Sequence, residues 1–160
     1  MKKTARHLKL KRKAEIVDLI IDQYNRVRKR KRFPRKVITN VVNLFFPESR
    51  HLGRGAFKEV LLIRSQAYKY VLKVSSLKST GRDWKIYNRL PRTLRNRYYA
   101  KIYWRTKYSL LQKYGKRVQL PDAELKKLRK FAKKYGLTDV RPGNIRKIDK
   151  HFKIVDANSR

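Results

Sequence analysis

The spacing of apolar residues near the N-terminus predicts two helices. Pro34 separates the two apolar series, and Pro47 follows the second of them. Apolar residues recur at helical spacing in each series, first at Ile16, Leu19, Ile20, Tyr24 and Val27 and then at Val37, Ile38, Val41, Val42, Phe45 and Phe46. We expect residues 1–50 to form a basic helical extension that packs on another element, with a flexible basic arm over residues 2–13.

The middle of the chain has the pattern of β-strands. Two short β-rich runs cover residues 56–64 and 67–74, and a weak turn signal between them predicts a hairpin. Strand-like alternation returns over residues 101–106 and 108–112. Residues 83–90 have helical spacing, so strands and helices are mixed and an α+β fold is expected.

The last third of the chain predicts a helix followed by a hairpin. Pro121 and Asp122 mark the start of the helix, and Gly136 ends it after a turn rich in lysine. Two short β-rich runs follow, over residues 144–148 and 152–155. The pattern therefore predicts one helix and one small hairpin near the C-terminus.

The charge of the chain points to a polyanionic partner. The 160 residues include 46 Lys and Arg against 11 Asp and Glu, a formal net charge of +35. Such an excess favours contact with nucleic acid, RNA above all or a ribonucleoprotein, although an anionic membrane, an acidic protein or solubility alone also explains it. The basic residues proposed to contact nucleic acid are Arg28, Lys29, Arg30, Lys31, Arg32, Arg92, Arg95 and Arg97.

Composition also bounds the compartment and the aromatic chemistry. The chain lacks cysteine, and its apolar runs are too short to span a bilayer, so we expect a cytoplasmic protein without a transmembrane segment. Aromatic residues alternate with basic ones between Arg82 and Arg117, as they do where bases stack on a protein. The same aromatics could instead form the core of a small sheet.

A glycine pair precedes the first strands. Gly53 and Gly55 would let backbone N–H groups approach phosphate oxygens, Phe57 could fold over the loop, and Val60 could cover an adenine ring. An ordinary hairpin turn explains the two glycines equally well. Lys73 lies among apolar residues on the next strand, either as a surface lysine or as a buried cation that needs an anion.

A third group of polar residues lies near the C-terminus. Asp139 is followed by Asn144 and then, beyond the predicted hairpin, by Asp156. In chain order the glycine pair, Lys73, the helix acid Asp83 and this trio resemble the protein-kinase-like superfamily over residues 51–157. The resemblance implies a minimal kinase-like domain over residues 51–160, with an antiparallel sheet as its upper lobe and a lower lobe reduced to one helix and a hairpin.

The resemblance also implies roles and ligands. Gly53, Gly55, Phe57 and Val60 would surround ATP, and Lys73 would contact its phosphates while Asp83 orients that lysine. Asp139 would be the catalytic base, with Asn144 and Asp156 as Mg²⁺ ligands.

Several departures leave the phosphate acceptor open. Lys58 stands at the third glycine position, and the sequence ends four residues after Asp156, without an activation loop. We therefore expect either a phosphotransferase whose acceptor belongs to a partner, protein or RNA, or an inactive kinase-like scaffold that binds nucleic acid.

Overall fold

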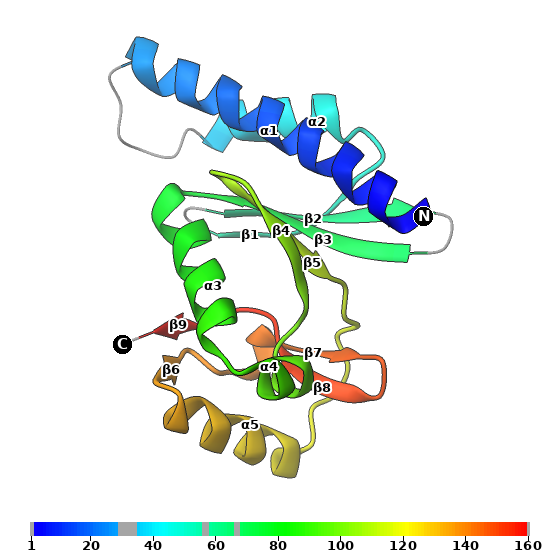
Figure 1. Cartoon of the computed structure of the whole chain (residues 1–160), viewed down its shortest axis with the longest axis vertical. Coiled ribbons are helices and arrows are strands. Elements are labelled where there is room, and N and C mark those ends of the chain that lie inside the picture. Colours follow the sequence, from blue (N-terminus) through cyan, green and yellow to red (C-terminus); the bar gives the residue numbers. More distant parts are fainter. Residues whose placement is uncertain (1, 29–34, 56–57, 66–67, 160) are drawn as a thin grey trace. The chain divides into compact units, whose positions relative to one another are not determined.

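The chain folds as two compact units, which are described separately. Unit 1 comprises Met1–Thr80 with Tyr103–Gln112, and unit 2 comprises Gly81–Ile102 with Lys113–Arg160. The computed structural model describes residues 2–28, 35–55, 58–65 and 68–159 (Figure 1). These residues contain five α-helices and a five-stranded antiparallel sheet, so the predicted α+β class is confirmed. The predicted boundary at residue 50 lies within unit 1.

A five-stranded sheet forms the centre of unit 1. Its strands occur in the order β1-β2-β3-β5-β4. Their bounds are Arg50–Gly55 (β1), Lys58–Ser65 (β2), Tyr68–Ser75 (β3), Ile102–Arg105 (β4) and Ser109–Lys113 (β5). The predicted pairing of the first two β-rich runs is confirmed, because β2 and β3 pair in antiparallel register from Lys58 opposite Ser75 to Ser65 opposite Tyr68.

Two helices complete the hydrophobic core of unit 1. They are α1 (Lys2–Arg28) and α2 (Arg35–Phe45), which lie side by side over the sheet (Figure 1). Alternate residues of β2 and β3 point to the same face, and those on the core face are Leu61, Ile63, Tyr70, Leu72 and Val74. Because the helices bury their own apolar side chains against this face, the sheet and the N-terminal helices form a single core.

The buried face of α1 differs from the predicted one. Ile16, Leu19 and Val27 are exposed, so the stripe chosen from the sequence was wrong. The helix instead buries Leu10, Ala14, Val17 and Ile21, which recur every three or four positions. The predicted flexible arm over residues 2–13 was also wrong, because α1 begins at Lys2 and its first half contributes Leu10 to the core.

Two acidic residues of α1 hold it on the turn between β4 and β5. Asp18 accepts hydrogen bonds from the backbone N–H groups of Lys107 (2.7 Å) and Tyr108 (3.2 Å). Burial raises the pKa of the Asp18 carboxyl. Hydrogen bonds from Thr106 and from these two N–H groups lower the same pKa, but burial has the larger effect. One turn later, Asp22 accepts from Lys107 Nζ at 2.8 Å and from Tyr108 Oη at 2.7 Å.

Unit 2 is built from helices and short strand pairs. Its sequence-predicted helix is α5 (Asp122–Lys134), which ends before Gly136 at φ = 63°. The predicted hairpin is also confirmed, as β7 (Ile145–Ile148) paired with β8 (His151–Ile154). The sequence did not predict α4 (Arg92–Tyr98) or the two-residue strands β6 (Leu137–Thr138) and β9 (Asn158–Ser159). Most of α3 (Leu77–Arg89) belongs to this unit as well.

The aromatic residues between Arg82 and Arg117 belong to the interior rather than to a stacking surface. Tyr87, Tyr99, Trp104 and Tyr108 are buried, and the other four aromatics of this stretch are partly buried. Tyr98, one of the partly buried rings, stacks on Phe131 of α5 with 4.4 Å between ring centroids. These side chains therefore serve packing, and the core interpretation of the pattern is the correct one.

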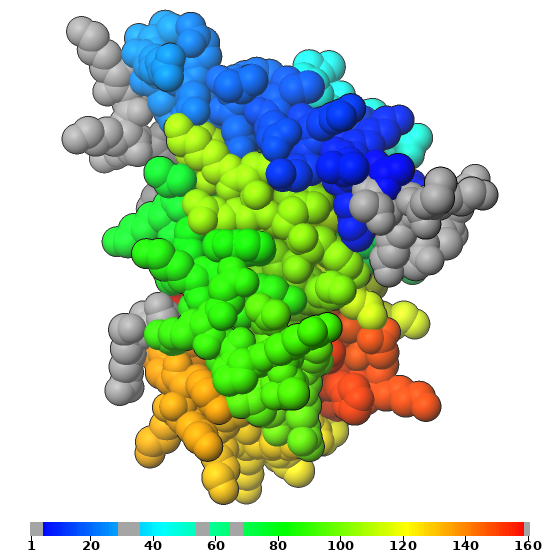
Figure 2. All heavy atoms as spheres, viewed as in Figure 1, coloured from blue at the N-terminus to red at the C-terminus, as the bar shows by residue number. Residues whose placement is uncertain are grey.

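The exposed face of α5 is strongly basic. Its side chains lie on the visible surface in Figure 2, where the helix is coloured yellow to orange. The exposed basic residues of this helix are Lys126, Lys127, Arg129, Lys130, Lys133 and Lys134. Across the described ranges, none of the helices combines the length and the apolar character that crossing a membrane requires.

Candidate functional site

In unit 1, three predicted nucleotide-binding residues form one row across neighbouring strands. Gly53 of β1 pairs with Val60 of β2, and Val60 pairs in turn with Lys73 of β3. Cross-strand partners share a face, so Val60 and Lys73 project from the same side of the sheet. That side is opposite the core face, as the alternation along β3 predicted. Phe57 lies outside the described residues.

The environment of Lys73 decides between its two interpretations. Only 5% of the residue is exposed, so Lys73 is not a surface lysine with its amine in water. Its neighbours on the same face, Val71 and Leu62, are buried as well. A lysine amine in such surroundings is strongly favoured when it meets an anion.

Strand β1, which contains Gly53, has an irregular register and is held at His51. The register between β1 and β2 shifts between His51 and Gly53, which marks a bulge. The surroundings of Gly53 are open, since a Cβ built there would meet no atom within 4 Å. His51 is held beside the fully buried Glu59, with 3.3 Å between Nδ1 and Oε2, and Thr39 Oγ1 donates to Glu59 at 3.3 Å. The strand is therefore anchored at its start and open at its glycine.

In unit 2, Asp139 and Asn144 are locked together. The Asn144 amide donates to the Asp139 backbone oxygen at 2.8 Å and to its carboxylate Oδ2 at 3.0 Å. Arg141 Nε lies 3.1 Å from the other carboxylate oxygen. Asp139 has φ = 60°, a left-handed conformation that Asp adopts more readily than most residues. Because the amide nitrogen of Asn144 donates here, its oxygen would be the atom that ligates a bound cation.

Backbone pairing brings Asp156 to the same place. Val155 N–H donates to the Asn144 carbonyl at 2.9 Å, directly before Asp156. Strands β6 and β9 pair with Thr138 opposite Asn158. Asp139 directly follows Thr138, and Asp156 comes two residues before Asn158, so both lie at the same end of this strand pair. Thus the three residues of the predicted catalytic and metal-binding trio are neighbours within unit 2.

Tyr99 and Asp83 extend this acidic neighbourhood. Tyr99 is 1% exposed, and burial raises the pKa of its hydroxyl well above 10, with the nearby charges of Asp83 and Asp156 as further causes. Tyr99 also forms a parallel bridge with Ile154, two residues before Asp156. Asp83 itself is buried in α3, at 2% exposure. Two carboxylates therefore lie near one phenol that the sequence did not single out.

The donor set suits a magnesium ion. Carboxylate and carboxamide oxygens are hard ligands of the kind Mg²⁺ prefers, and Asn144 and Asp156 would supply them here. The Tyr99 hydroxyl has no hydrogen-bond partner among the described residues, so a water on an ion bound near Asp156 would meet a buried polar atom there. No group of three His, Cys, Asp or Glu side chains within the described ranges could hold a metal. Magnesium binding here would therefore depend on the carboxamide of Asn144.

A hollow of about 320 Å³ opens beside Asp139. It is bounded by α5 and the segment after it, including Arg129, Lys133, Thr138 and Asp139. Its two basic side chains and one carboxylate would suit a polar, negatively charged group placed next to Asp139. The hollow therefore offers room for a phosphate acceptor on the side of unit 2.

The predicted nucleic-acid contacts are placed unequally. Lys29, Arg30, Lys31 and Arg32 lie outside the described residues, and Arg28 is the exposed last residue of α1. Arg92 is exposed at the start of α4. Arg95 is used within unit 2, since its guanidinium lies 4.5 Å from the centroid of the Tyr87 ring.

Arg97 faces a larger basic hollow on unit 2. This hollow of about 540 Å³ is lined by Arg97, Lys127, Lys150 and His151 together with one carboxylate, that of Glu124. Thr93 and Asn96 add hydrogen-bonding groups to its wall. The arrangement is suited to phosphate and sugar oxygens, which are the groups that non-specific nucleic-acid contacts use.

Comparison with known proteins gives no independent identification. Neither the protein-family models nor the curated proteins searched include a match to this chain.

Sequence reasoning missed Tyr99 because a buried tyrosine has no motif of its own. It belonged to the run of aromatics for which the sequence suggested base stacking or core packing, and neither points to a metal or phosphate site. The interpretation of the site therefore depends on its geometry and on the chemistry of its side chains.

Proposed function

We propose that the chain is a minimal kinase-like phosphotransferase that binds ATP and Mg²⁺. The observation that carries the proposal is the hydrogen bonding of Asn144 to Asp139, together with the backbone bond from Val155 to Asn144 that brings the adjacent Asp156 near them within unit 2. A buried Lys73 in register with Val60 and Gly53 supports it from unit 1. Phosphoryl transfer mainly requires positioned positive charge and an oriented hydroxyl, and these residue types supply both.

Each residue has a definite task in this proposal. Asn144 and Asp156 hold Mg²⁺, which neutralises the phosphate oxygens when bound. The ammonium of Lys73 adds a second positive charge on the phosphates. Asp139 accepts the proton of the acceptor hydroxyl as its oxygen bonds to the γ-phosphorus, while the bond to the leaving oxygen breaks and ADP departs.

The acceptor is proposed to belong to a partner. The hollow beside Asp139 leaves the carboxylate accessible, and its Arg129 and Lys133 favour a hydroxyl carried on a negatively charged molecule. A protein or an RNA hydroxyl meets this description.

Transfer of labelled γ-phosphate tests the proposal. The chain is incubated with Mg²⁺ and γ-labelled ATP, and label on protein and label released as phosphate are both measured. Asp139→Asn should reduce transfer by at least about a hundredfold and leave ATP affinity within about twofold, because a general base contributes about 10²–10⁴. Asp149→Asn is the matched control, since Asp149 is also an exposed aspartate at positive φ in unit 2. Equal transfer by the wild type and Asp139→Asn would contradict a base at Asp139.

A second candidate function is a scaffold that binds nucleic acid, and the basic hollow around Arg97 favours it. Three cationic side chains against one carboxylate would hold a phosphate backbone without reading its sequence. Binding of a single-stranded oligoribonucleotide should weaken linearly on a log–log plot against salt. Arg97→Glu together with Lys150→Glu should lower affinity more than Arg12→Glu with Lys36→Glu, an equal charge change at exposed helix positions in unit 1. Equal losses in the two variants would remove the hollow from the account.

A further inference from the structure

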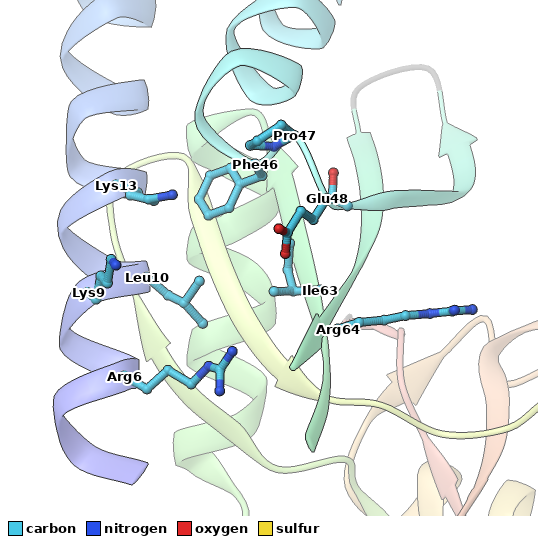
Figure 3. Close-up of a pocket in the computed structure, with 10 residues that line it drawn as sticks. Arg6, Lys9, Leu10, Lys13, Phe46, Pro47, Glu48, Ile63 and Arg64 are labelled. Carbon is cyan, nitrogen blue, oxygen red and sulfur yellow. The ribbon is translucent and has the colours of Figure 1, made fainter. Parts of the chain in front are cut away.

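A hollow with an apolar floor and a charged rim lies in unit 1, and none of the residues assigned above lines it. Its volume is about 300 Å³, and α1, the segment that follows α2 and the end of β2 form its walls (Figure 3). Arg6, Lys9 and Lys13 project from α1 along one side in Figure 3. The proposed phosphotransfer uses none of the residues of this hollow.

The floor of the hollow is part of the hydrophobic core. Leu10, Phe46 and Ile63 come from three different elements and converge in Figure 3. Each is no more than 9% exposed and belongs to the buried cluster beneath the sheet face. An apolar side chain inserted here would touch core residues on three sides, so its transfer from water would be favourable.

The rim of the hollow is cationic. Arg6 and Lys9 are exposed and lie one turn apart on α1, and the exposed Arg64 stands at the end of β2. Lys13 is already engaged, because its ammonium donates to the Phe45 carbonyl at 3.0 Å and lies 5.8 Å from the centroid of the Phe46 ring. Arg6 and Lys9 are therefore the cations that an incoming anion would meet, since the Arg64 side chain points away from the floor in Figure 3.

One acidic side chain makes the rim selective. Glu48 also lines the hollow, and its carboxylate is directed toward it in Figure 3. A phosphate backbone carries a negative charge at every nucleotide, so one of its charges would lie near Glu48 and be repelled. An acidic peptide can place its carboxylates on the cations and donate a hydrogen bond from a backbone N–H group to the Glu48 carboxylate. The rim, with cations and one carboxylate, and the apolar floor therefore match an acidic peptide better than RNA.

We propose that this hollow docks an acidic segment of a partner protein, with one aliphatic side chain on the floor and flanking carboxylates on Arg6 and Lys9. The apolar side chain supplies most of the free energy of binding, and the carboxylates supply orientation and a faster encounter. This docking requires neither ATP nor Mg²⁺, so it stands or falls separately from the proposed phosphotransfer.

Fluorescence anisotropy of labelled peptides tests the docking. The probe is a short peptide with one central leucine flanked by glutamates, and its companion has alanine in place of the leucine. The leucine peptide should bind at least about tenfold more tightly, because the missing carbons no longer reach the floor. Arg6→Glu with Lys9→Glu should weaken the leucine peptide by about tenfold or more, whereas Arg12→Glu with Lys36→Glu should change it by less than about threefold.

Two results would overturn the inference. Equal weakening by the two charge-reversal variants would mean that the peptide responds only to net charge. Equal binding of the leucine and alanine peptides would mean that the floor takes no side chain. An oligoribonucleotide of about twelve nucleotides is titrated in parallel, and a loss of its affinity confined to Arg6→Glu with Lys9→Glu would assign the hollow to RNA instead. Circular dichroism of each variant verifies that α1 remains helical.

Discussion

Asp18 of unit 1 and Asp139 of unit 2 are held in opposite ways. In unit 1, Asp18 is buried and receives backbone N–H groups from a turn that is distant in sequence. In unit 2, Asp139 is accessible and its carboxylate is held by side chains, those of Arg141 and Asn144. A chain with 46 basic and 11 acidic residues has few carboxylates to place. A carboxylate bound by backbone donors stabilises the fold, whereas one held at a strand end by side chains remains available to a ligand.

Removal of the Asp18 side chain should have the largest effect on stability. Asp18→Ala leaves two backbone N–H groups of the β4–β5 turn without their acceptor, and should lower the free energy of unfolding by about 3 kcal/mol. Asp18→Asn keeps one acceptor oxygen and should lose less. Urea denaturation monitored by tryptophan fluorescence measures both variants. A change below about 0.5 kcal/mol in Asp18→Ala would show that this carboxylate does not anchor α1.

The second prediction concerns pH and Asp22. Burial alone would raise the pKa of Asp22, but the hydrogen bonds from Lys107 and Tyr108 outweigh it and lower that pKa below its ordinary value. A lowered folded-state pKa means that the stabilisation is present above the unfolded-state value near 3.9 and disappears as pH falls through the folded-state value. Asp22→Asn should therefore lower the unfolding free energy by about 1 kcal/mol at pH 7 and by much less near pH 2.5. A pH-independent difference would contradict this assignment.

The third prediction concerns Asp139 of unit 2 and has the smallest expected effect on stability. Asp139→Asn should change the free energy of unfolding by no more than about 0.5 kcal/mol, because Asn also tolerates positive φ and the partners of Asp139 are accessible to water. The same denaturation experiment measures it. A loss as large as that of Asp18→Ala would mean that Asp139 serves the fold, and the contrast between the two units would be lost.

The sequence predicted the larger elements because each has local signals. The helix α5 has Asp122 at its start and a glycine at positive φ after its end. The pairing of β2 with β3 was predicted from two β-rich runs that are close together in the sequence. The face of α1 was wrong because apolar content alone placed Ile16 and Leu19 inside. The true face includes Asp18, whose burial is compensated by donors some ninety residues away.

The sequence proposed the residues of the candidate site but did not predict the backbone pairing that brings them together. The spacing of Asp139, Asn144 and Asp156 selected the trio, and unit 2 brings these residues together. The pairing that does so uses strands of two residues, which are too short to give a periodic pattern. Similarly, Arg95 was chosen for its charge, whereas its stacking on Tyr87 depends on packing that no local motif records.

The most direct test of the central proposal is a thermal shift with Mg²⁺ and ATP added together. A ligand bound only to the native state stabilises it by RT ln(1 + [L]/Kd), or about 2.7 kcal/mol at a hundredfold excess over Kd. The account predicts a clear rise in Tm for the wild type and none for Asp156→Ala, whose own Tm without ligand serves as the reference. An equal rise in both proteins would contradict the assignment of Asp156 as a metal ligand, and no rise in the wild type would contradict nucleotide binding itself.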